Sequence, residues 1–97
     1  MSKRLKIRRL DKVRSDSHFI VEAQIIRFMN KGNSRIWIDE QEVLEPGEAF
    51  EEGDTDGPGF RHSYKIDFIP LDNPPSTDVP AVYNGNMLKM RVFTREK

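Results

Sequence analysis

Apolar and polar residues alternate along several short stretches of this chain, which is the pattern of β-strands that bury one face. In the clearest stretch, 60–68, every second residue is aromatic, apolar or histidine, namely Phe60, His62, Tyr64, Ile66 and Phe68. This alternation predicts a strand that buries Ile66 and Phe68 and turns Lys65 and Asp67 toward solvent.

Shorter stretches with the same period predict further strands over 5–10, 35–39 and 86–94, and a short candidate strand over 41–44. In the last strand we expect three residues to face inward: Leu88, Met90 and Val92. Glycine, asparagine and proline predict turns at 30–33, 46–47 and 84–85. We expect 12–17 to be a polar connection and 71–80, which contains three prolines, to be an extended crossing rather than a paired strand.

The segment 17–30 supports two interpretations. Its first half alternates in the manner of a strand, with Phe19, Val21, Ala23 and Ile25 on one side and Ile20, Glu22 and Gln24 on the other. However, Ser17 and Gly32 stand where the N-cap and the C-cap of a helix would be, so a helix between them is the alternative. The alternation and the β-branched residues favour the strand.

A glycine-rich acidic stretch, 51–59, precedes the clearest strand. It holds three glycines and a proline and has no apolar residue. We expect it to be a loop that is mobile in the isolated protein and becomes ordered against a basic partner surface.

Short strands separated by regular turn signals predict an all-β fold. The favoured architecture is a small β-sandwich of six or seven strands, and a small β-barrel is the alternative. The chain has 97 residues, the size of one domain, which we expect to span 1–97.

Composition excludes several classes of protein. The chain has no cysteine, which rules out disulfides, cysteine-based zinc sites and thiol nucleophiles. No apolar stretch approaches the roughly 18 residues of a membrane helix, and the basic first residues are not followed by the apolar run of a signal peptide. We therefore expect a protein that stays in the cytoplasm or is assembled there into something that leaves the cell by lysis.

The charge of the chain is zero in total but segregated along the sequence. Residues 1–14 contain seven basic side chains against Asp11 alone, whereas residues 39–56 contain nine acidic side chains and no basic one. Two solvated faces that neutralise each other within one monomer would explain this pattern. The other interpretation is a molecule with a positive and a negative end, suited to head-to-tail packing between copies.

The chain offers no recognisable catalytic constellation, which would need a nucleophile, a base and an orienting group that converge. Its only histidines are His18 and His62. His62 lies on the apolar face of its predicted strand, where a hydrogen-bonded position in the core or at its rim explains it. Carboxylates are abundant but cluster in one loop, so we do not expect an enzyme.

A bound cofactor or metal is not expected either. The glycines of 51–59 lie in an acidic setting that would repel a phosphate group. The segment 54–57, Asp-Thr-Asp-Gly, matches part of a calcium-binding loop, but His62 occupies the position where the pattern needs a bidentate glutamate. A flexible acidic loop is the favoured interpretation, and a divalent ion shared with a neighbouring chain is the alternative.

Nucleic-acid binding is a second possibility for the basic N-terminal segment. Trp37 and Tyr64 could stack on bases, but the zero net charge counts against recognition of a phosphate backbone. Trp37 points away from Ile36 and Ile38 in its predicted strand. It is therefore either the core residue of that strand or an exposed anchor for a partner.

Residues 33–38, Asn-Ser-Arg-Ile-Trp-Ile, and residues 43–50, Val-Leu-Glu-Pro-Gly-Glu-Ala-Phe, combine a polar turn, an Ile-x-Ile strand and a Leu-x-Pro-Gly-Glu segment that leads into an acidic loop. This combination resembles a pattern in small β-sandwich virion proteins of tailed phages, such as capsid-decorating (auxiliary) proteins and collar or tail components. The resemblance implies a structural role, repeated copies and contacts with a larger shell.

The expected function is therefore that of a structural virion or assembly protein that docks onto a larger particle by charged surfaces. A small binding module, for example for single-stranded nucleic acid, is the alternative. The expected partners are other protein chains, either capsid or tail proteins or further copies of this chain, and not membranes. The residues expected to make these contacts are Arg8, Arg9, Arg14, Trp37, Glu51, Glu52, Asp54 and Asp56.

Overall fold

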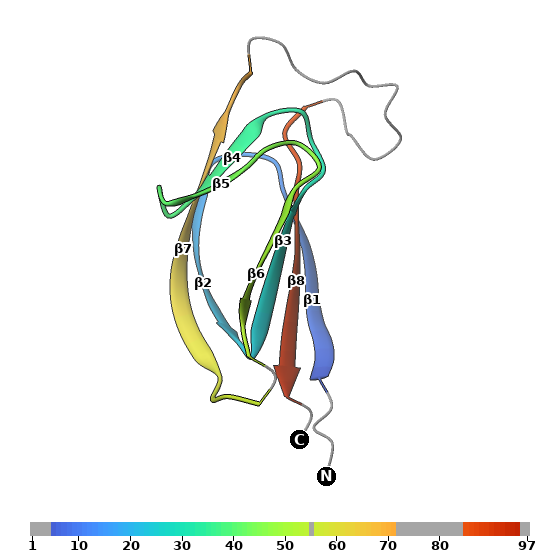
Figure 1. Ribbon diagram of the computed structural model, residues 1–97, viewed down its shortest axis with the longest axis vertical. Helices are drawn as coiled ribbons and strands as arrows, with labels where there is room; N and C mark the ends of the chain where they lie inside the picture. Colours follow the sequence, from blue (N-terminus) through green and yellow to red (C-terminus); the bar gives the residue numbers. More distant parts are fainter. Residues whose placement is uncertain (1–4, 55, 72–84, 96–97) are drawn as a thin grey trace.

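The computed structural model describes residues 5–54, 56–71 and 85–95, with the backbone alone for 5–11 and 95. Within these residues the protein consists of eight β-strands in two four-stranded antiparallel sheets that pack against each other (Figure 1). The strands are β1 (Leu5–Val13), β2 (Ser17–Ala23), β3 (Ile25–Asn30), β4 (Arg35–Ile38), β5 (Glu42–Leu44), β6 (Ala49–Gly53), β7 (Phe60–Ile69) and β8 (Leu88–Arg95). The described part of the chain contains no helix of the length and apolar character needed to cross a bilayer.

The expected all-β sandwich is confirmed, with eight strands in place of six or seven. Sheet A has the strand order β1-β8-β3-β6, and sheet B has the order β2-β7-β4-β5. The two sheets do not close into a barrel, so the barrel alternative is wrong. The strand alternation places one apolar face of each sheet in a shared core.

Both sheets contribute to that core. Its most deeply buried side chains come from β3 and β8 of sheet A and from β4 and β7 of sheet B: Ile26, Phe28, Ile36, Ile38, Tyr64, Ile66, Leu88 and Met90. The rings of Phe28 and Tyr64 meet edge to face across the two sheets, with centroids 5.1 Å apart. The predicted inward face of 86–94 is confirmed, since Leu88, Met90 and Val92 are all buried.

The predicted register of 60–68 is confirmed at its centre and weakens toward its end. Ile66 is fully buried and Lys65 is exposed, as expected. Phe68, expected in the core, and Asp67, expected in solvent, are both only half-buried. These residues lie near the end of β7, where the facing sheet covers less of the strand.

The segment 17–30 is extended, as favoured, but it forms two strands in different sheets. β2 belongs to sheet B and β3 to sheet A, and the chain crosses between them at Gln24. The crossing changes the phase of the alternation, because Val21 and Ala23 face the core from one sheet while Ile26 and Phe28 face it from the other. The expectation of one continuous strand through Ile25 is therefore wrong.

Gln24 is buried, with 4% of its surface exposed, and its polar groups are bonded. Its backbone N–H donates to the carbonyl of Phe93 (2.8 Å), and its carbonyl accepts the N–H of Asp54 (3.2 Å). Its side-chain amide donates to the carbonyl of Asp54 (2.5 Å) and to that of Gly57. Gly53 is needed beside it, since its φ is 117° and a Cβ there would lie 2.2 Å from the Gln24 carbonyl oxygen.

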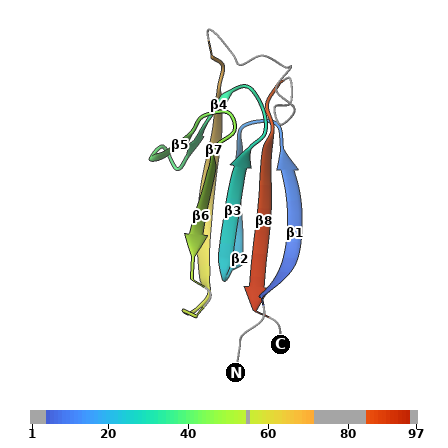
Figure 2. The same ribbon diagram turned by 45° about the vertical axis from the view of Figure 1, so that its right-hand side comes forward.

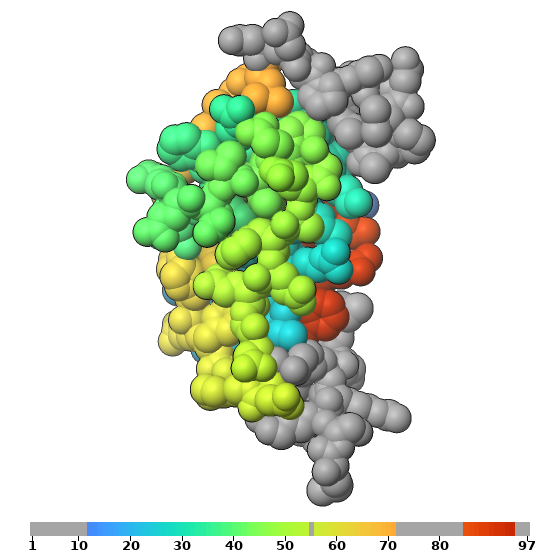
Figure 3. Space-filling view, viewed as in Figure 1, coloured from blue at the N-terminus to red at the C-terminus, as the bar shows by residue number. Residues whose placement is uncertain are grey.

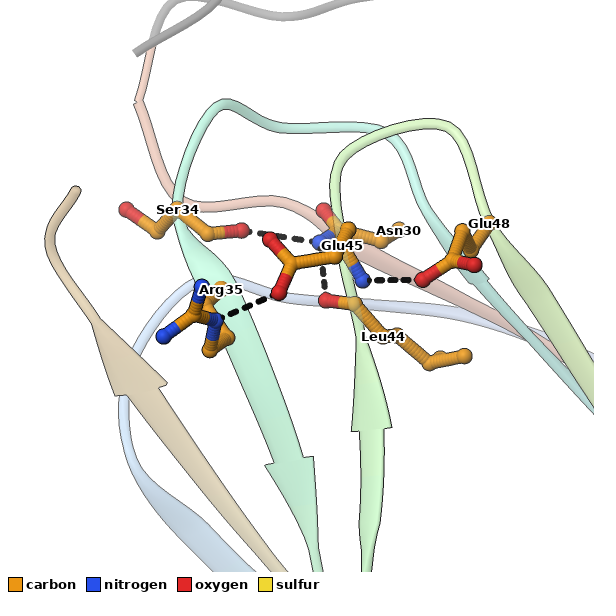
Figure 4. Close-up of polar contacts among 6 residues, drawn as sticks. All are labelled: Asn30, Ser34, Arg35, Leu44, Glu45 and Glu48. Carbon is orange, nitrogen blue, oxygen red and sulfur yellow. Dashed lines mark hydrogen bonds and ion pairs between the residues drawn. The ribbon is translucent and has the colours of Figure 1, made fainter. Parts of the chain in front are cut away.

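Asn30 plays the same part at the other end of β3. It is 1% exposed, and its side-chain amide donates to the carbonyls of Ser34 (2.8 Å) and Leu44 (2.9 Å), while its side-chain oxygen accepts the N–H of Gly32 (3.1 Å). Its backbone N–H donates to the carbonyl of Glu48 (2.9 Å). Figure 4 shows this group of residues where the turns before β4 and before β6 meet. The side chain of Asn30 thus joins both turns to β3.

The acidic stretch 51–59 is not a loop throughout, which corrects the expectation from its composition. Glu51, Glu52 and Gly53 belong to β6 and pair with Arg27, Ile26 and Ile25 of β3. An outer strand can form without a continuous apolar face when its partner strand supplies the hydrogen bonds. The carbonyls of Asp54 and Gly57 are also bonded to Gln24, so this part is tied to the sandwich.

Two expectations near the N-terminus also change. β1 extends to Val13, which packs against the core, so the connection to β2 is shorter than the predicted 12–17. The pairing of β1 with β8 shifts register between Ile7 and Arg9, which is a β-bulge and breaks the simple alternation expected for 5–10. The expected crossing over 71–80 and the turn at 84–85 lie mostly outside the described residues.

The buried position of Ile66 and the exposed position of Lys65 allow a matched test of the strand register. We expect Ile66→Ala to lower the free energy of unfolding by about 2–5 kcal/mol, because it removes fully buried methyl groups and leaves a cavity. Lys65→Ala removes only exposed, solvent-screened ion pairs and should lower the free energy of unfolding far less. Urea unfolding of both variants measures the difference, and equal shifts of the two midpoints would show that the register is wrong.

Candidate docking site at the acidic edge of the sandwich

The charge of sheet A changes sign from one side to the other. Its first outer strand, β1, contains four basic residues and one acid: Lys6, Arg8, Arg9, Lys12 and Asp11. The two inner strands contain basic charges only: Arg27, Lys89, Arg91 and Arg95. The other outer strand, β6, contains only acidic charges, Glu51 and Glu52.

The two outer strands of sheet A therefore form edges of opposite charge, on opposite sides of the molecule in Figure 2. We call β1 the basic edge. We call residues 39–56, which include β5 and β6, the acidic edge, and it contains Asp39, Glu40, Glu42, Glu45, Glu48, Glu51, Glu52, Asp54 and Asp56. These residues form one continuous surface, green to yellow-green in Figure 3.

A cavity of about 120 Å³ lies in the acidic edge, between the β4–β5 hairpin and β6. Carboxylates and rings share its lining, which includes Asp39, Glu42, Phe50, Glu52, His62 and Tyr64. Residues of both sheets therefore line the cavity.

Three hydrogen bonds order the polar groups around this cavity. The carboxylate of Asp39 lies 2.8 Å from Nε2 of His62 and also accepts the backbone N–H of Lys65 (2.8 Å). The Tyr64 hydroxyl donates to the carboxylate of Glu52 (2.8 Å). The His62 and Tyr64 rings lie with their centroids 4.4 Å apart, so the bonds of Asp39 and of Glu52 belong to one packed group.

The turn that presents Asp39 has an uncommon backbone. Asp39 and Glu40 have φ values of 56° and 58°, in the left-handed region that residues other than glycine rarely adopt. The Gln41 N–H closes the turn on the Ile38 carbonyl (3.1 Å), and the Asp39 carboxylate ties it to β7. The contacts of Asp39 offset the cost of this conformation.

The acids of the acidic edge fall into two groups. Several are bonded within the molecule: besides Asp39 and Glu52, Glu40 lies 2.5 Å from Nζ of Lys65 and Glu45 lies 2.6 Å from Nε of Arg35. By contrast, the carboxylates of Glu42, Glu51 and Asp56 make no hydrogen bond or ion pair with the residues that the structure describes. These three carboxylates are exposed and are available to a basic partner.

The sequence-predicted contact residues divide between three places. Glu51, Glu52, Asp54 and Asp56 come together at the acidic edge, within or directly after β6. Arg8 and Arg9 lie in β1 at the opposite edge, with their side chains outside the description, and Arg14 is exposed in the connection that follows. Trp37 lies apart from both groups, on the outer face of sheet B.

Trp37 matches neither of its two expected roles fully. It is half-buried, opposite Val43 of β5 and Asp67 of β7. Its indole Nε1 is buried without a hydrogen-bond partner among the described residues. Val43 beside it is 44% exposed, so the pair forms a small apolar area on this face.

Within the described part of the chain, Ser63, the two histidines and Asp39 do not form a catalytic relay. Asp39 is bonded to His62, whereas the Ser63 hydroxyl lies 2.5 Å from Nε2 of the other histidine, His18. No group of three potential metal ligands occurs within the described ranges 5–54, 56–71 and 85–95. In the calcium-like segment, the Asp54 carboxylate instead accepts the Asp56 N–H (3.0 Å).

Sequence reasoning missed the bonds of Asp39 with His62 and of Tyr64 with Glu52. Each joins residues more than ten positions apart, across strands whose neighbours are known only once the sheet order is known. A signal existed for Gln24, because it is a polar residue within an otherwise apolar run, 23–26.

The buried, hydrogen-bonded position of Tyr64 predicts how the stability of the protein changes at alkaline pH. Burial, followed by the hydrogen bond to the Glu52 carboxylate, raises the pKa of Tyr64 above its ordinary value of about 10. The folded protein thus favours the neutral phenol, and this contribution to stability is complete below the pKa of the unfolded chain and is lost as pH rises toward the folded value. Tyr83 is the other tyrosine of the chain, so a Tyr83→Phe variant reports on Tyr64 alone. In this variant we expect the phenolate absorbance of Tyr64 to appear only at a pH above its ordinary pKa, together with unfolding.

Glu52→Gln provides the control for the carboxylate, and it should lower the pKa of Tyr64 only in part because burial remains. Reversible ionisation of Tyr64 near its ordinary pKa, with the near-UV circular dichroism of the folded protein unchanged, would contradict this description.

Comparisons of the chain with protein-family models, with curated proteins and with solved structures find no match. The resemblance to small virion proteins therefore rests on the residues quoted for it, 33–38 and 43–50.

Proposed function

We propose that this protein is a structural assembly component, of the capsid-decorating, collar or tail kind, that docks onto a larger particle through its charged edges. One observation carries the proposal. The basic strand β1 and the acidic strand β6 are opposite edges of sheet A, with β8 and β3 between them, so these two strands do not lie side by side within one molecule. Their complementarity is available to other chains.

Docking by charge requires a surface that makes several ion pairs, because one pair is too weak. An exposed ion pair contributes about 0–1 kcal/mol, so docking requires several pairs that are partly desolvated and supported by other contacts. Glu42, Glu51 and Asp56 offer three carboxylates without partners among the described residues, and Glu42 also lines the cavity together with Asp39 and Glu52. A basic partner surface would meet charge and shape together at this edge.

Binding of single-stranded nucleic acid is the second candidate. It is favoured by the pairing of Arg27 directly with Arg91, with Lys89 two residues away on β8. Two observations count against it. Tyr64 is in the core and cannot stack on a base, and Trp37 lies in the other sheet. A shift assay with a fluorescent oligonucleotide separates the candidates, since salt-sensitive binding of the oligonucleotide would favour this second function.

Charge reversal at the basic edge tests the assembly role. We expect Arg8→Glu combined with Arg9→Glu to leave the fold intact, because an edge strand tolerates either charge, and to prevent incorporation into particles. Tagged wild-type and variant protein would be produced in cells that make the natural chain, and particles would be separated on a density gradient. The effect should match that of salt on the wild type, because the screening length falls from about 10 Å at 0.1 M to about 3 Å at 1 M.

Lys31→Glu combined with Arg61→Glu is the matched control. It changes the net charge by the same amount, at the turn after β3 and on sheet B, away from the basic edge. Normal incorporation of the Arg8 and Arg9 variant would contradict docking by this edge, and equal loss in the control would assign the effect to net charge alone.

A further inference from the structure

The two edge strands of sheet A have charges of opposite sign. An outer strand offers unpaired backbone groups to other chains, and proteins commonly guard it with charged residues or a bulge. β1 has both, since it is basic and contains the bulge between Ile7 and Arg9. Charges of one sign on both edges would repel every edge-to-edge contact. Opposite charges repel only contacts between like edges and favour the contact of β1 with β6.

The backbone of β6 can accept a further strand. In an antiparallel pair, the N–H and C=O groups of alternate residues point to the same neighbour. Glu48 and Asp54 are both bonded to β3, through the Asn30 N–H to the Glu48 carbonyl (2.9 Å) and through the Asp54 N–H to the Gln24 carbonyl (3.2 Å). With the unbroken register between them, Ala49, Glu51 and Gly53 direct these groups to the open side.

The strand directions also fit. Sheet A contains four strands, and each runs antiparallel to its neighbours, as the arrowheads in Figure 2 show. β1 and β6 therefore run in opposite directions. A second copy placed beside the first in the same orientation would set its β1 antiparallel to β6 of the first, and the alternation of the sheet would continue across the contact.

We propose that the partner of the acidic edge is a second copy of this chain, whose β1 adds to β6 as an antiparallel strand and extends sheet A. This inference takes the assembly role proposed above and names the chain itself as a partner. The contact is head to tail, so a pair of copies keeps one free basic edge and one free acidic edge, and association continues into a chain or closes into a ring.

The size of β6 limits the strength of this contact. It has five residues, and stable interfaces typically bury about 1,200–2,000 Å² in total. We therefore expect association that is reversible, depends on concentration and weakens with salt. Such a contact suits copies that are already concentrated on a particle.

Sedimentation velocity of the purified full chain tests the inference. At about 0.01 M salt, where the screening length is about 30 Å, the wild type should form dimers and longer species as concentration rises, and about 1 M salt should return it to monomer. A wild type that remains monomeric across the whole concentration series at low salt would overturn the inference.

Two charge-reversal variants then identify the edges. Arg8→Glu with Arg9→Glu reverses the basic edge, and Glu51→Lys with Asp56→Lys reverses carboxylates that have no partner among the described residues. Each variant alone should be monomeric, because the first has lost the basic charge of β1 and the second has lost the net negative charge of β6. A mixture retains the unaltered contact, between β1 of the second variant and β6 of the first, and should associate at concentrations where neither variant does so alone. Association of either variant alone, or none in the mixture, would overturn the head-to-tail contact.

Ala49→Pro tests strand pairing without any change in charge. It removes an N–H on the open side of β6 and leaves the bonds to β3 in place. We expect the variant to stay folded, judged by its urea midpoint, and to lose association, whereas Ala49→Ser should associate like the wild type. Equal association of Ala49→Pro and Ala49→Ser would show that the edges do not pair as strands.

These experiments distinguish a failure of this inference from a failure of the proposed assembly role. If the wild type does not self-associate but the Arg8 and Arg9 variant still fails to enter particles, the inference fails and the proposed function stands with another protein as partner. If the wild type self-associates but the variant enters particles normally, the contact between copies stands and docking by the basic edge fails.

Discussion

Two buried carboxamides, one at each end of β3, hold the outer strand β6 in position. Gln24 donates to carbonyls directly after β6, and Asn30 donates to the carbonyl of Ser34, before β4, and to that of Leu44, at the end of β5. A buried donor that loses its acceptor costs about 1–3 kcal/mol, so both ends of β6 are fixed even though the strand itself buries little apolar surface. This explains how a segment rich in glutamate and glycine joins a sheet.

The position of β6 determines how charge is distributed over the molecule. With β6 beside β3, the strand order puts the acidic strand at the far side of sheet A from the basic β1. Had the acidic segment paired with β1 instead, the two charges would have cancelled within the monomer. The same bonds to Asn30 and Gln24 that stabilise the fold therefore keep the two edges available for other chains, which is the basis of the proposed assembly role.

The alternation of residues was sufficient to predict the all-β class, most of the strands and the burial of Ile66, because these depend on the local period of the chain. It could not predict that the chain changes sheet at Gln24, since the buried amide finds its partners in a segment some thirty residues away. For the same reason, composition suggested a loop where Glu51 and Glu52 form a strand. The charge segregation was evident in the sequence, but its placement on opposite edges follows only from the strand order.

The substitution Asn30→Asp tests most directly whether a buried carboxamide holds this arrangement. It keeps the size of the side chain but replaces the two-donor amide with a carboxylate, which would face the carbonyls of Ser34 and Leu44. We expect urea unfolding at neutral pH to show a loss of at least about 1–3 kcal/mol, with partial recovery in acid where the carboxyl group regains a proton to donate. Gln41→Glu is the control, because it makes the same change from carboxamide to carboxylate at an exposed side chain that has no hydrogen bond to the described residues. A wild-type midpoint for Asn30→Asp at neutral pH would contradict the account.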